Sequence, residues 1–358
     1  MTAPTPLLDL DDGDALVAAD TEGVLRSAAT GGAQIRATRS AVEEGVLDRL
    51  KGLRPRSVVV VTGSGRASRG AALLTAVLAE RIGFPLLRAP GTPMWVGPLD
   101  VVVVAGDDAG DPRLVRAVDA AVRRGAEVVV AAPDEGPLRS AAAGRVAMLA
   151  PRIPALRRHG LLRYFAVLLA VLRVVGAERP ENEVPDLERL AAAADDEALR
   201  DRPDNETFHN PAKSLASRML GRRIVLAGDS ASGVEIAGHG AEALLHAGRV
   251  ATVSELSDVL TAAGTFRSQS IESHDPIFHD PELDGPPPVP PVRTFVVSAE
   301  EDRVLIERKT VVLGDVDLVS VSSGEVPLTS ERSELEQAVV LVGRLDMTAA
   351  YLQLIGGI

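Results

Sequence analysis

Two short polar segments follow runs of β-branched residues in the first half of the chain. The first is Gly63-Ser64-Gly65, with Ser68 close behind it. Glycines let the backbone turn sharply and approach a ligand, and serine hydroxyls can hydrogen-bond an anion or a sugar. The pattern Gly-x-Gly-x-x-Ser is one residue short of the dinucleotide fingerprint, and Arg88 is placed to accept a 2′-phosphate. Three interpretations stay open: a sugar or anion site, an NADP site, and a tight turn capped by its own serine.

The second polar segment, residues 106–111, carries three carboxylates. A phosphate dianion about 4 Å from one carboxylate would be repelled by on the order of 4 kcal/mol at an effective dielectric of about 20, so we expect phosphate not to bind there. The carboxylates can instead cap the helix expected to begin at Pro112, or join further ligands around Mg²⁺ or Ca²⁺. From both segments, the residues predicted to bind a ligand are Gly63, Ser64, Gly65, Ser68, Asp107, Asp108 and Gly110.

Candidate proton-transfer groups lie in the second half of the chain. Glu242 follows His239 by three residues and precedes His246 by four, so a helix would place them near one another. Such a cluster can relay a proton or bind Zn²⁺, although zinc-binding histidine pairs prefer a closer, i, i+4 spacing. Ordinary surface or packing histidines are the alternative. Glu255, after the next expected strand, is a further candidate base.

The elements that must position these residues alternate between strands and helices, which predicts an α/β fold with parallel sheets. The plan occurs twice. The intervals from Gly63 to Gly83 and from Gly228 to Gly248 are equal, and each contains a turn and a helix, which indicates an internal duplication. We predict strands at 57–61, 85–88, 100–105, 127–131, 223–227, 250–253, 293–298 and 316–319, and helices at 34–53, 67–82, 112–124, 161–175 and 335–355.

Acidic and proline-containing segments along the chain predict the domain organisation. We expect a flexible segment at 1–20, a first domain at 21–177, a linker at 178–205 and a second domain at 206–358. The linker segment is acidic and contains three prolines. A proline-rich run at 285–291 is expected to be an extended surface loop. His274 and His279, just ahead of it, are interpreted as polar loop residues.

Composition excludes several classes of function. The chain has 38 Lys+Arg against 50 Asp+Glu, a net charge of -12, so neither nucleic acid nor an anionic membrane is an expected partner. The absence of cysteine rules out disulfides and thiol catalysis. The start of the chain does not resemble a signal peptide, so we expect a cytoplasmic protein. The apolar run 161–176 is too short and too charged to span a membrane and predicts a buried helix. No metal or cofactor is predicted.

Several segments together resemble one known family. They are Thr62-Gly63-Ser64-Gly65, the strand 101–104 with the helix ending at Arg124-Gly125-Ala126, Asn210-Pro211-Ala212-Lys213, and Asp346 with Tyr351-Leu352. In this order they are similar to the SIS (sugar isomerase) domain family, in particular to bifunctional phosphoglucose/phosphomannose isomerases and actinobacterial TobH-like proteins. The resemblance covers nearly the full length. It implies two flavodoxin-like SIS subdomains, each a parallel sheet flanked by helices, a homodimer, and metal-free aldose-ketose isomerisation of a hexose 6-phosphate.

The chain departs from this family at the positions that carry chemistry. Active members have a loop similar to Ser-x-Ser-Gly-Asn-Thr, which cradles the substrate phosphate, whereas residues 106–111 contain no hydroxyl. His246 occupies the position of the family's helical glutamate, with Glu242 one turn earlier, and no histidine follows Glu255 in the next segment. The resemblance therefore predicts a protein that binds a sugar phosphate or related carbohydrate derivative, with isomerase activity impaired or absent. The alternatives are an active glucose-6-phosphate/mannose-6-phosphate isomerase using Glu242, His246 or Glu255, and an NADP-binding protein.

Overall fold

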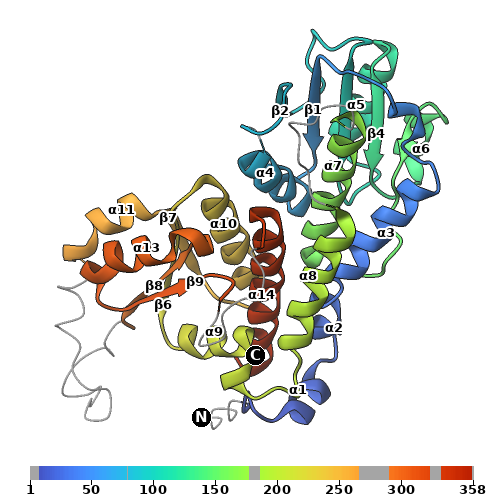
Figure 1. Cartoon of the computed structure of the whole chain (residues 1–358). Helices are drawn as coiled ribbons and strands as arrows, with labels where there is room; N and C mark the ends of the chain where they lie inside the picture. The colour runs from blue at the N-terminus through green and yellow to red at the C-terminus, as the bar shows by residue number, and fades with distance from the viewer. Residues whose placement is uncertain (1–7, 79, 177–185, 266–289, 323–331, 357–358) are drawn as a thin grey trace, which may run out of the picture. The chain divides into compact units, whose positions relative to one another are not determined.

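The computed structural model describes residues 8–356 apart from 79, 177–185, 266–289 and 323–331. These residues divide into two compact units. The five-stranded unit comprises the described parts of Glu22–Leu199 and Arg332–Gly343, and the four-stranded unit those of Met1–Thr21, Arg200–Glu331 and Arg344–Ile358. Each unit contains one parallel β-sheet flanked by helices (Figure 1). The predicted fold class is therefore confirmed.

The sheet of the five-stranded unit has the order β2-β1-β3-β4-β5, and all its strand pairs are parallel. Its strands are β1 (Ser57–Thr62), β2 (Leu86–Ala89), β3 (Asp100–Ala105), β4 (Glu127–Ala131) and β5 (Ala147–Met148). Its helices are α2 (Val24–Ala28), α3 (Gly31–Glu43), α4 (Arg66–Leu78), α5 (Pro112–Arg123), α6 (Gly136–Ala142), α7 (Leu161–Gly176) and most of α8 (Leu187–Arg200). The order 2-1-3-4-5 is that of flavodoxin-like folds.

Both faces of this sheet are covered, which explains why its central strands are runs of valine. Val59 and Val61 of β1 belong to a core with Leu114 of α5. The alternate residues Val58 and Val60 face the opposite side, where they pack against α4 and α7. Because successive strand residues point to opposite faces, a continuous apolar run is what a strand between two helical layers requires.

The four-stranded unit repeats the first four positions of that order, as β7-β6-β8-β9, again with parallel pairs. Its strands are β6 (Arg223–Gly228), β7 (Ala251–Glu255), β8 (Val292–Val297) and β9 (Val316–Val319). Its helices are α1 (Gly13–Ala19), α9 (Pro211–Met219), α10 (Ala231–His246), α11 (Leu256–Thr261), α13 (Arg303–Thr310) and the second half of α14 (Glu334–Ile355). The common strand order supports the duplication inferred from the glycine intervals.

Close helix packing covers one face of this second sheet. A Cβ atom placed on Gly240 of α10 would lie 3.1 Å from Leu226 of β6 and 3.2 Å from Leu345 of α14. Gly240 therefore lets α10 lie close to both the sheet and α14. On the other face, Leu256 of α11 and Ile306 of α13 belong to the core that contains the alternate strand residues.

The predicted strands agree with the observed ones to within two residues, while the short β5 was not predicted. The helix predicted at 34–53 is wrong in its second half. Helix α3 ends at Glu43, because Gly45 adopts a left-handed φ of +88° and turns the chain. His274, His279 and residues 285–289 of the proline-rich run lie outside the described residues.

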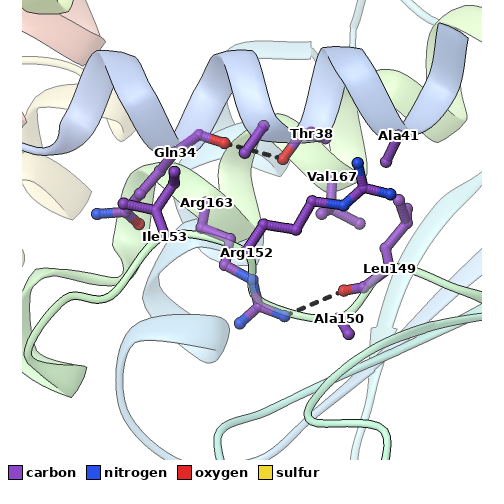
Figure 2. A pocket seen from close by; sticks show the side chains of 10 residues that line it. Gln34, Thr38, Ala41, Leu149, Ala150, Arg152, Ile153, Arg163 and Val167 are labelled. Carbon is purple, nitrogen blue, oxygen red and sulfur yellow. Dashed lines mark hydrogen bonds between the residues drawn. The ribbon is translucent and has the colours of Figure 1, made fainter. Parts of the chain in front are cut away.

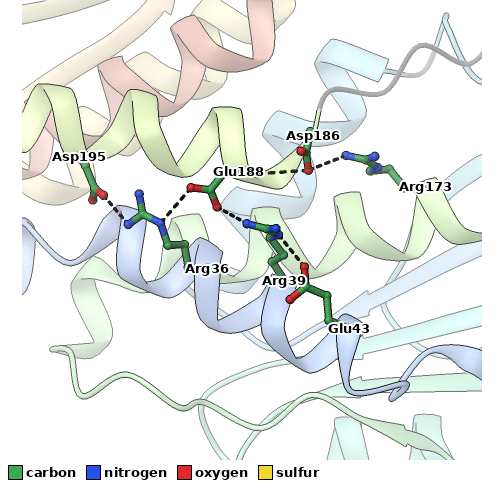
Figure 3. Close-up of polar contacts among 7 residues, drawn as sticks. All are labelled: Arg36, Arg39, Glu43, Arg173, Asp186, Glu188 and Asp195. Atoms are coloured by element: carbon green, nitrogen blue, oxygen red, sulfur yellow. Dashed lines mark hydrogen bonds and ion pairs between the residues drawn. The ribbon is translucent and has the colours of Figure 1, made fainter.

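The segment predicted as a linker, 178–205, contains helix α8, which is tied to α3 by ion pairs (Figure 3). Glu188 bridges Arg36 at 3.4 Å and Arg39 at 2.5 Å, and Asp195 contacts Arg36 as well. The apolar side of α8 is buried. In the described structure, α8 is thus a packed part of the five-stranded unit.

The predicted flexible segment, 1–20, includes helix α1. Leu16 of α1 is fully buried, and Asp12 caps the helix by accepting a hydrogen bond of 2.9 Å from the Ala15 amide. Asp11 accepts hydrogen bonds from the amide and hydroxyl of Thr207 at 2.6 and 2.7 Å. These contacts join α1 to the segment preceding α9 within the four-stranded unit.

Two long apolar helices can be compared with the requirements of a membrane span. Helix α7, the predicted buried helix, extends over Leu161–Gly176 and is largely buried. Among the described helices, α14 has the length and mean hydropathy of a membrane span, but 83% of its apolar window is buried inside the protein. Such burial is typical of a core helix.

Candidate functional site

The strand orders define one preferred ligand position in each unit. In an open parallel sheet, ligands bind beyond the carboxyl ends of the strands, where the strand order reverses direction. The reversal lies between β1 and β3 in the five-stranded unit and between β6 and β8 in the four-stranded unit. We call these positions the first and second switch points. The predicted ligand residues lie in the two loops of the first switch point, except Ser68, which lies in the first turn of α4.

The β1–α4 turn is the open side of the first switch point. The Gly63 amide donates to the Ala105 carbonyl at 2.8 Å, which joins the turn to the end of β3. Gly65 has a φ of +82°, and a Cβ atom there would meet nothing within 4 Å. Ser64 and Gly65 are exposed, and Ser68 is partly exposed. The turn therefore presents backbone amides and hydroxyls to solvent at the start of a 13-residue helix.

A cationic residue follows this turn directly. Arg66 is the first residue of α4 and is buried. Its Nε donates to the Arg158 carbonyl at 2.7 Å, which fixes the side chain against the segment before α7. The helix N-terminus adds its own partial positive charge. Together they make the β1–α4 side of the switch point attractive to an anion.

The opposite side of the first switch point is acidic. Asp107 accepts a hydrogen bond from the Tyr164 hydroxyl of α7, and burial raises the pKa of Tyr164 well above its usual range, which keeps the phenol protonated as a donor. Asp108 is exposed and accepts from the Gly110 amide at 2.8 Å. The tyrosine and the amide thus hold two carboxylates in fixed positions after β3.

Asp111 has the capping role predicted as one alternative. It is the N-cap of α5 and accepts from the Arg113 amide at 2.8 Å. The Arg113 guanidinium, 3.0 Å away, lowers the pKa of Asp111. A Cβ atom on Gly63 would lie 3.7 Å from the Asp111 carboxylate, so the two loops are neighbours. The first switch point therefore joins an anion-attracting turn to an acidic loop.

The second switch point has the same place in the fold but a closed turn. A Cβ atom on Gly228 would lie 2.1 Å from the Val234 amide nitrogen, so the strand end is packed directly on α10. Ser230 caps α10 through the Gly233 amide at 3.1 Å. The Ser298 hydroxyl donates to the Ala299 carbonyl at 3.0 Å. The turn's packing and hydroxyls serve the unit's own structure.

Asp229 is the acidic residue of this second turn. Burial raises its pKa, and the nearby negative charge of Asp302 acts in the same direction. One carboxylate oxygen accepts a long hydrogen bond of 3.4 Å from Ser298. The other oxygen is buried and has no hydrogen-bond partner among the described residues. The environment therefore disfavours the ionised form of Asp229.

The three predicted catalytic candidates are not brought together. Glu255 is exposed at the end of β7, opposite Gly228 in the parallel register. His246 ends the 16-residue helix α10, and a rise of about 1.5 Å per residue places it roughly 22 Å from the start of the helix at the switch point. Glu242 lies about 16 Å from that start on the same rise. Neither can reach a ligand at the second switch point together with Glu255.

The proposed histidine cluster on α10 is divided between the interior and the surface. His239 is fully buried and its Nε2 lies 3.1 Å from Asp346 of α14, whereas His246 is exposed. Across the part of the chain that the structure describes, no group of three His, Asp or Glu side chains is arranged to hold a metal ion. The zinc interpretation therefore has no geometric support there.

The Asn210-Pro211-Ala212-Lys213 motif forms a buried polar centre. The Lys213 ammonium donates to the carbonyls of Pro203 and Asn205 at 2.6 and 2.8 Å, and burial lowers its pKa. Asn210 caps α9 through the Lys213 amide at 2.9 Å. The Tyr351 hydroxyl donates to the Asp201 carbonyl at 2.5 Å. This motif holds the segment before α9 against α14.

One pocket, which lies between α3, α7 and the segment after β5, is lined by two arginines (Figure 2). Its interior has room for no more than about one water molecule. Arg152 pairs with Glu44 through both carboxylate oxygens at 2.5 and 2.6 Å. Arg163 donates to the Leu149 carbonyl at 3.1 Å. The pocket is too small for a sugar, and both of its cations already have partners.

The NADP interpretation depended on Arg88 and the glycine-rich turn. Arg88 is exposed on the edge strand β2, and the strand-turn-helix context of the turn is present. The sheet order is 2-1-3-4-5, however, and not the 3-2-1-4-5-6 order of dinucleotide-binding folds. The topology therefore favours the interpretation without a dinucleotide.

Two residues of the first switch point were missed by sequence reasoning. Arg66 gave a usable signal, because it directly follows the Gly-Ser-Gly turn at the start of a predicted helix. Tyr164 gave none, because it lies inside an apolar run far from Asp107 in the sequence. Only the packing of α7 against α4 brings its hydroxyl to the acidic loop.

Comparison with known proteins places this geometry in a known fold. No family model and no curated protein matches the sequence. A hypothetical protein of Thermus thermophilus has a TM-score of 0.65 at 13% identity, covering 97% of this chain and 89% of that one. A candidate phosphosugar isomerase of Clostridium difficile has a TM-score of 0.63 at 11% identity, covering 93% of both.

An Escherichia coli structure extends the comparison. The tagatose-6-phosphate ketose/aldose isomerase of that organism has a TM-score of 0.57 at 16% identity, covering 98% of this chain and 96% of that one. These likenesses extend over nearly the whole of each chain. They show that the chain has the two-sheet fold of these proteins.

Proposed function

We propose that the protein is an SIS-domain protein that binds a sugar phosphate or a related carbohydrate derivative at the first switch point. The observation that carries the proposal is the two-sided chemistry of that point. The β1–α4 turn offers amides, the hydroxyls of Ser64 and Ser68, and the charge of Arg66, whereas Asp107 and Asp108 offer acceptors across from it. A sugar phosphate has a matching anionic end and hydroxyl-donating end.

The ligand is oriented by charge. We infer that the phosphate lies at the α4 N-terminus and that the sugar hydroxyls face Asp107 and Asp108. The reverse orientation would bring phosphate against the carboxylates, at a cost on the order of 4 kcal/mol for one contact near 4 Å. Gly63, Gly65 and Gly110 keep the backbone open at the two loops. This assigns a role to each predicted ligand residue.

We further propose that the protein does not catalyse aldose-ketose isomerisation. Proton transfer between neighbouring carbons requires a base within hydrogen-bond reach of the sugar. Glu242 and His246 lie well along α10 from the second switch point, so that of the three candidates Glu255 alone lies at the strand ends there. On this proposal, the similarity to isomerases extends to the fold and the class of ligand but not to the reaction. A division into two SIS subdomains, a homodimer and a cytoplasmic location belong to the same proposal.

Calorimetric titration tests the binding site. Glucose 6-phosphate, mannose 6-phosphate and fructose 6-phosphate should bind more tightly than either inorganic phosphate or free glucose. The double variant Ser64→Ala/Ser68→Ala should lose about tenfold or more in affinity, because each lost hydrogen bond to a charged group is worth about 1.5–3 kcal/mol. Ser140→Ala, an exposed serine on α6, is the matched control. Equal affinity in both variants would refute the site.

A coupled isomerase assay at high protein concentration tests the absence of catalysis. We expect no turnover of glucose 6-phosphate or mannose 6-phosphate above the background. Turnover that disappears in Glu242→Gln but persists in Glu235→Gln, another glutamate of α10, would establish an active isomerase instead. Because binding is measured separately, failure of the binding proposal and failure of the inactivity proposal give different results.

A further inference from the structure

The connection between β2 and β3 carries a second surface. It lies at the end of the five-stranded sheet opposite to the first switch point. Parallel strands are usually joined by a helical crossover, but residues 90–99 form no helix. Three large apolar side chains in this connection are exposed, namely Met94 at 85%, Trp95 at 48% and Leu99 at 68%. We call these three residues the Trp95 surface. It adjoins the amino ends of the strands, away from the first switch point.

The Trp95 surface is held in place by two arginines. The Arg56 guanidinium lies 5.6 Å from the centre of the Trp95 ring and donates to the Trp95 carbonyl at 2.9 Å. Arg124 donates to the Pro93 carbonyl at 2.7 Å and to the Met94 sulfur at 2.9 Å. Val96 between them is buried in the sheet core. The exposed side chains are therefore presented by a fixed loop, which lowers the entropic cost of binding.

The residue types on this surface are typical of the centre of a protein–protein interface. Tryptophan, methionine and arginine are the residues enriched at protein interfaces, and tryptophan and arginine dominate their binding energy. Solitary exposed apolar residues are common, but three within six positions form a cluster. The chain contains no other tryptophan.

The charge of the Trp95 surface indicates which kind of partner would bind it. Arg56 is balanced by the buried Asp100 at 2.5 Å, whereas Arg124 donates only to carbonyls and sulfur and faces no carboxylate among the described residues. The surface is locally cationic although the chain carries a net charge of -12. A twofold pairing of two copies through this surface would place each copy's arginines against the other's. An acidic partner avoids that repulsion.

We propose that the Trp95 surface binds an acidic segment of another protein that carries an aliphatic or aromatic anchor residue. The anchor packs on Met94, Trp95 and Leu99, and the acidic residues face Arg124 and the exposed part of Arg56. This interaction is independent of the ligand proposed at the first switch point.

Selection from a displayed library of short random peptides tests the proposal. Full-length protein is the target, and the variant Met94→Ser/Leu99→Ser is used for depletion. Selected peptides should combine Asp or Glu with Leu, Ile or Phe. A synthetic peptide of the selected sequence should change the fluorescence of Trp95. Its affinity should fall about tenfold in Met94→Ser/Leu99→Ser and in Arg124→Gln, and weaken as salt rises.

Leu245→Ser, an exposed leucine of the four-stranded unit, should leave the affinity unchanged. Selected peptides without acidic residues, or equal binding to the depleted variant, would overturn the proposal. Sedimentation of the protein alone provides a separate outcome. Self-association that is lost in Met94→Ser/Leu99→Ser would assign the surface to a second copy of the chain and would also overturn it.

Discussion

The two switch points occupy equivalent places in a duplicated fold and have opposite local structures. At the first, the Gly63-Ser64-Gly65 turn is open, and a side chain added at Gly65 would meet nothing within 4 Å. At the second, Gly228 lies directly on the backbone of α10, and Ser230 is used as a helix cap. Strand order alone would nominate both as ligand sites. The packing of the turn therefore decides which of the two positions is available to a ligand.

The largest expected effect comes from testing this packing with one methyl group at each turn. Gly228→Ala should lower the free energy of unfolding by about 3 kcal/mol, because the new Cβ atom must displace backbone atoms of α10. The control Gly63→Ala should lower it by under about 0.5 kcal/mol, because its Cβ atom would lie no closer than 3.7 Å to any neighbour. Urea unfolding measures both. Equal losses would show that the two turns do not differ in packing.

The carboxylates beside the two switch points offer a second contrast, since their pKa values shift in opposite directions. Asp111→Ala should cost about 1 kcal/mol at pH 7 through loss of the α5 cap. The pKa of Asp111 is lowered in the folded state, so the charge-dependent part of its stabilisation is present above the unfolded pKa of about 3.9. It is lost as the pH falls through the lower, folded value. Urea denaturation of the variant and the wild type should be followed from pH 7 downward. The difference between their free energies of unfolding should shrink only at acidic pH.

The charge of Asp229 should destabilise the folded protein, whereas that of Asp111 stabilises it. Burial raises its pKa, so the ionised carboxylate opposes folding at neutral pH and the opposition fades as the pH falls through the raised, folded value. Asp229→Asn should therefore stabilise the protein at pH 7 by under about 1 kcal/mol. The gain should diminish at lower pH, as followed by thermal denaturation at several pH values. A loss of stability at pH 7 would show that the charge is needed there.

Exposed ion pairs far from both switch points should contribute least to stability. Glu188→Gln removes the bridge between Arg36 and Arg39 on the exposed side of α3 and α8. These side chains are each 41% exposed, so solvent screens the pairs and the expected cost is about 0.5 kcal/mol. The cost should disappear near 1 M salt, where the Debye length is about 3 Å. A salt-independent loss would indicate that Glu188 acts through packing.

Much of the first switch point was predictable from sequence because its determinants are local. The valine runs at 57–61 and 100–105 specify buried parallel strands, and the glycines and aspartates after them specify turns and a helix cap. The same reasoning placed Glu242 and His246 on one helix but could not show that α10 carries them away from the sheet edge. It also overextended α3, because a left-handed conformation at Gly45 is not visible in helical periodicity.

By itself, the sequence determined the two-part α/β plan, the strand positions and the acidic character of residues 106–111, since these depend on residue type and spacing along one stretch of chain. The tertiary structure decided which turn stays open, which carboxylates are already engaged and which helix supplies Tyr164. Those outcomes depend on how close atoms from distant segments come to one another. Such distances are fixed by packing, which no local pattern encodes.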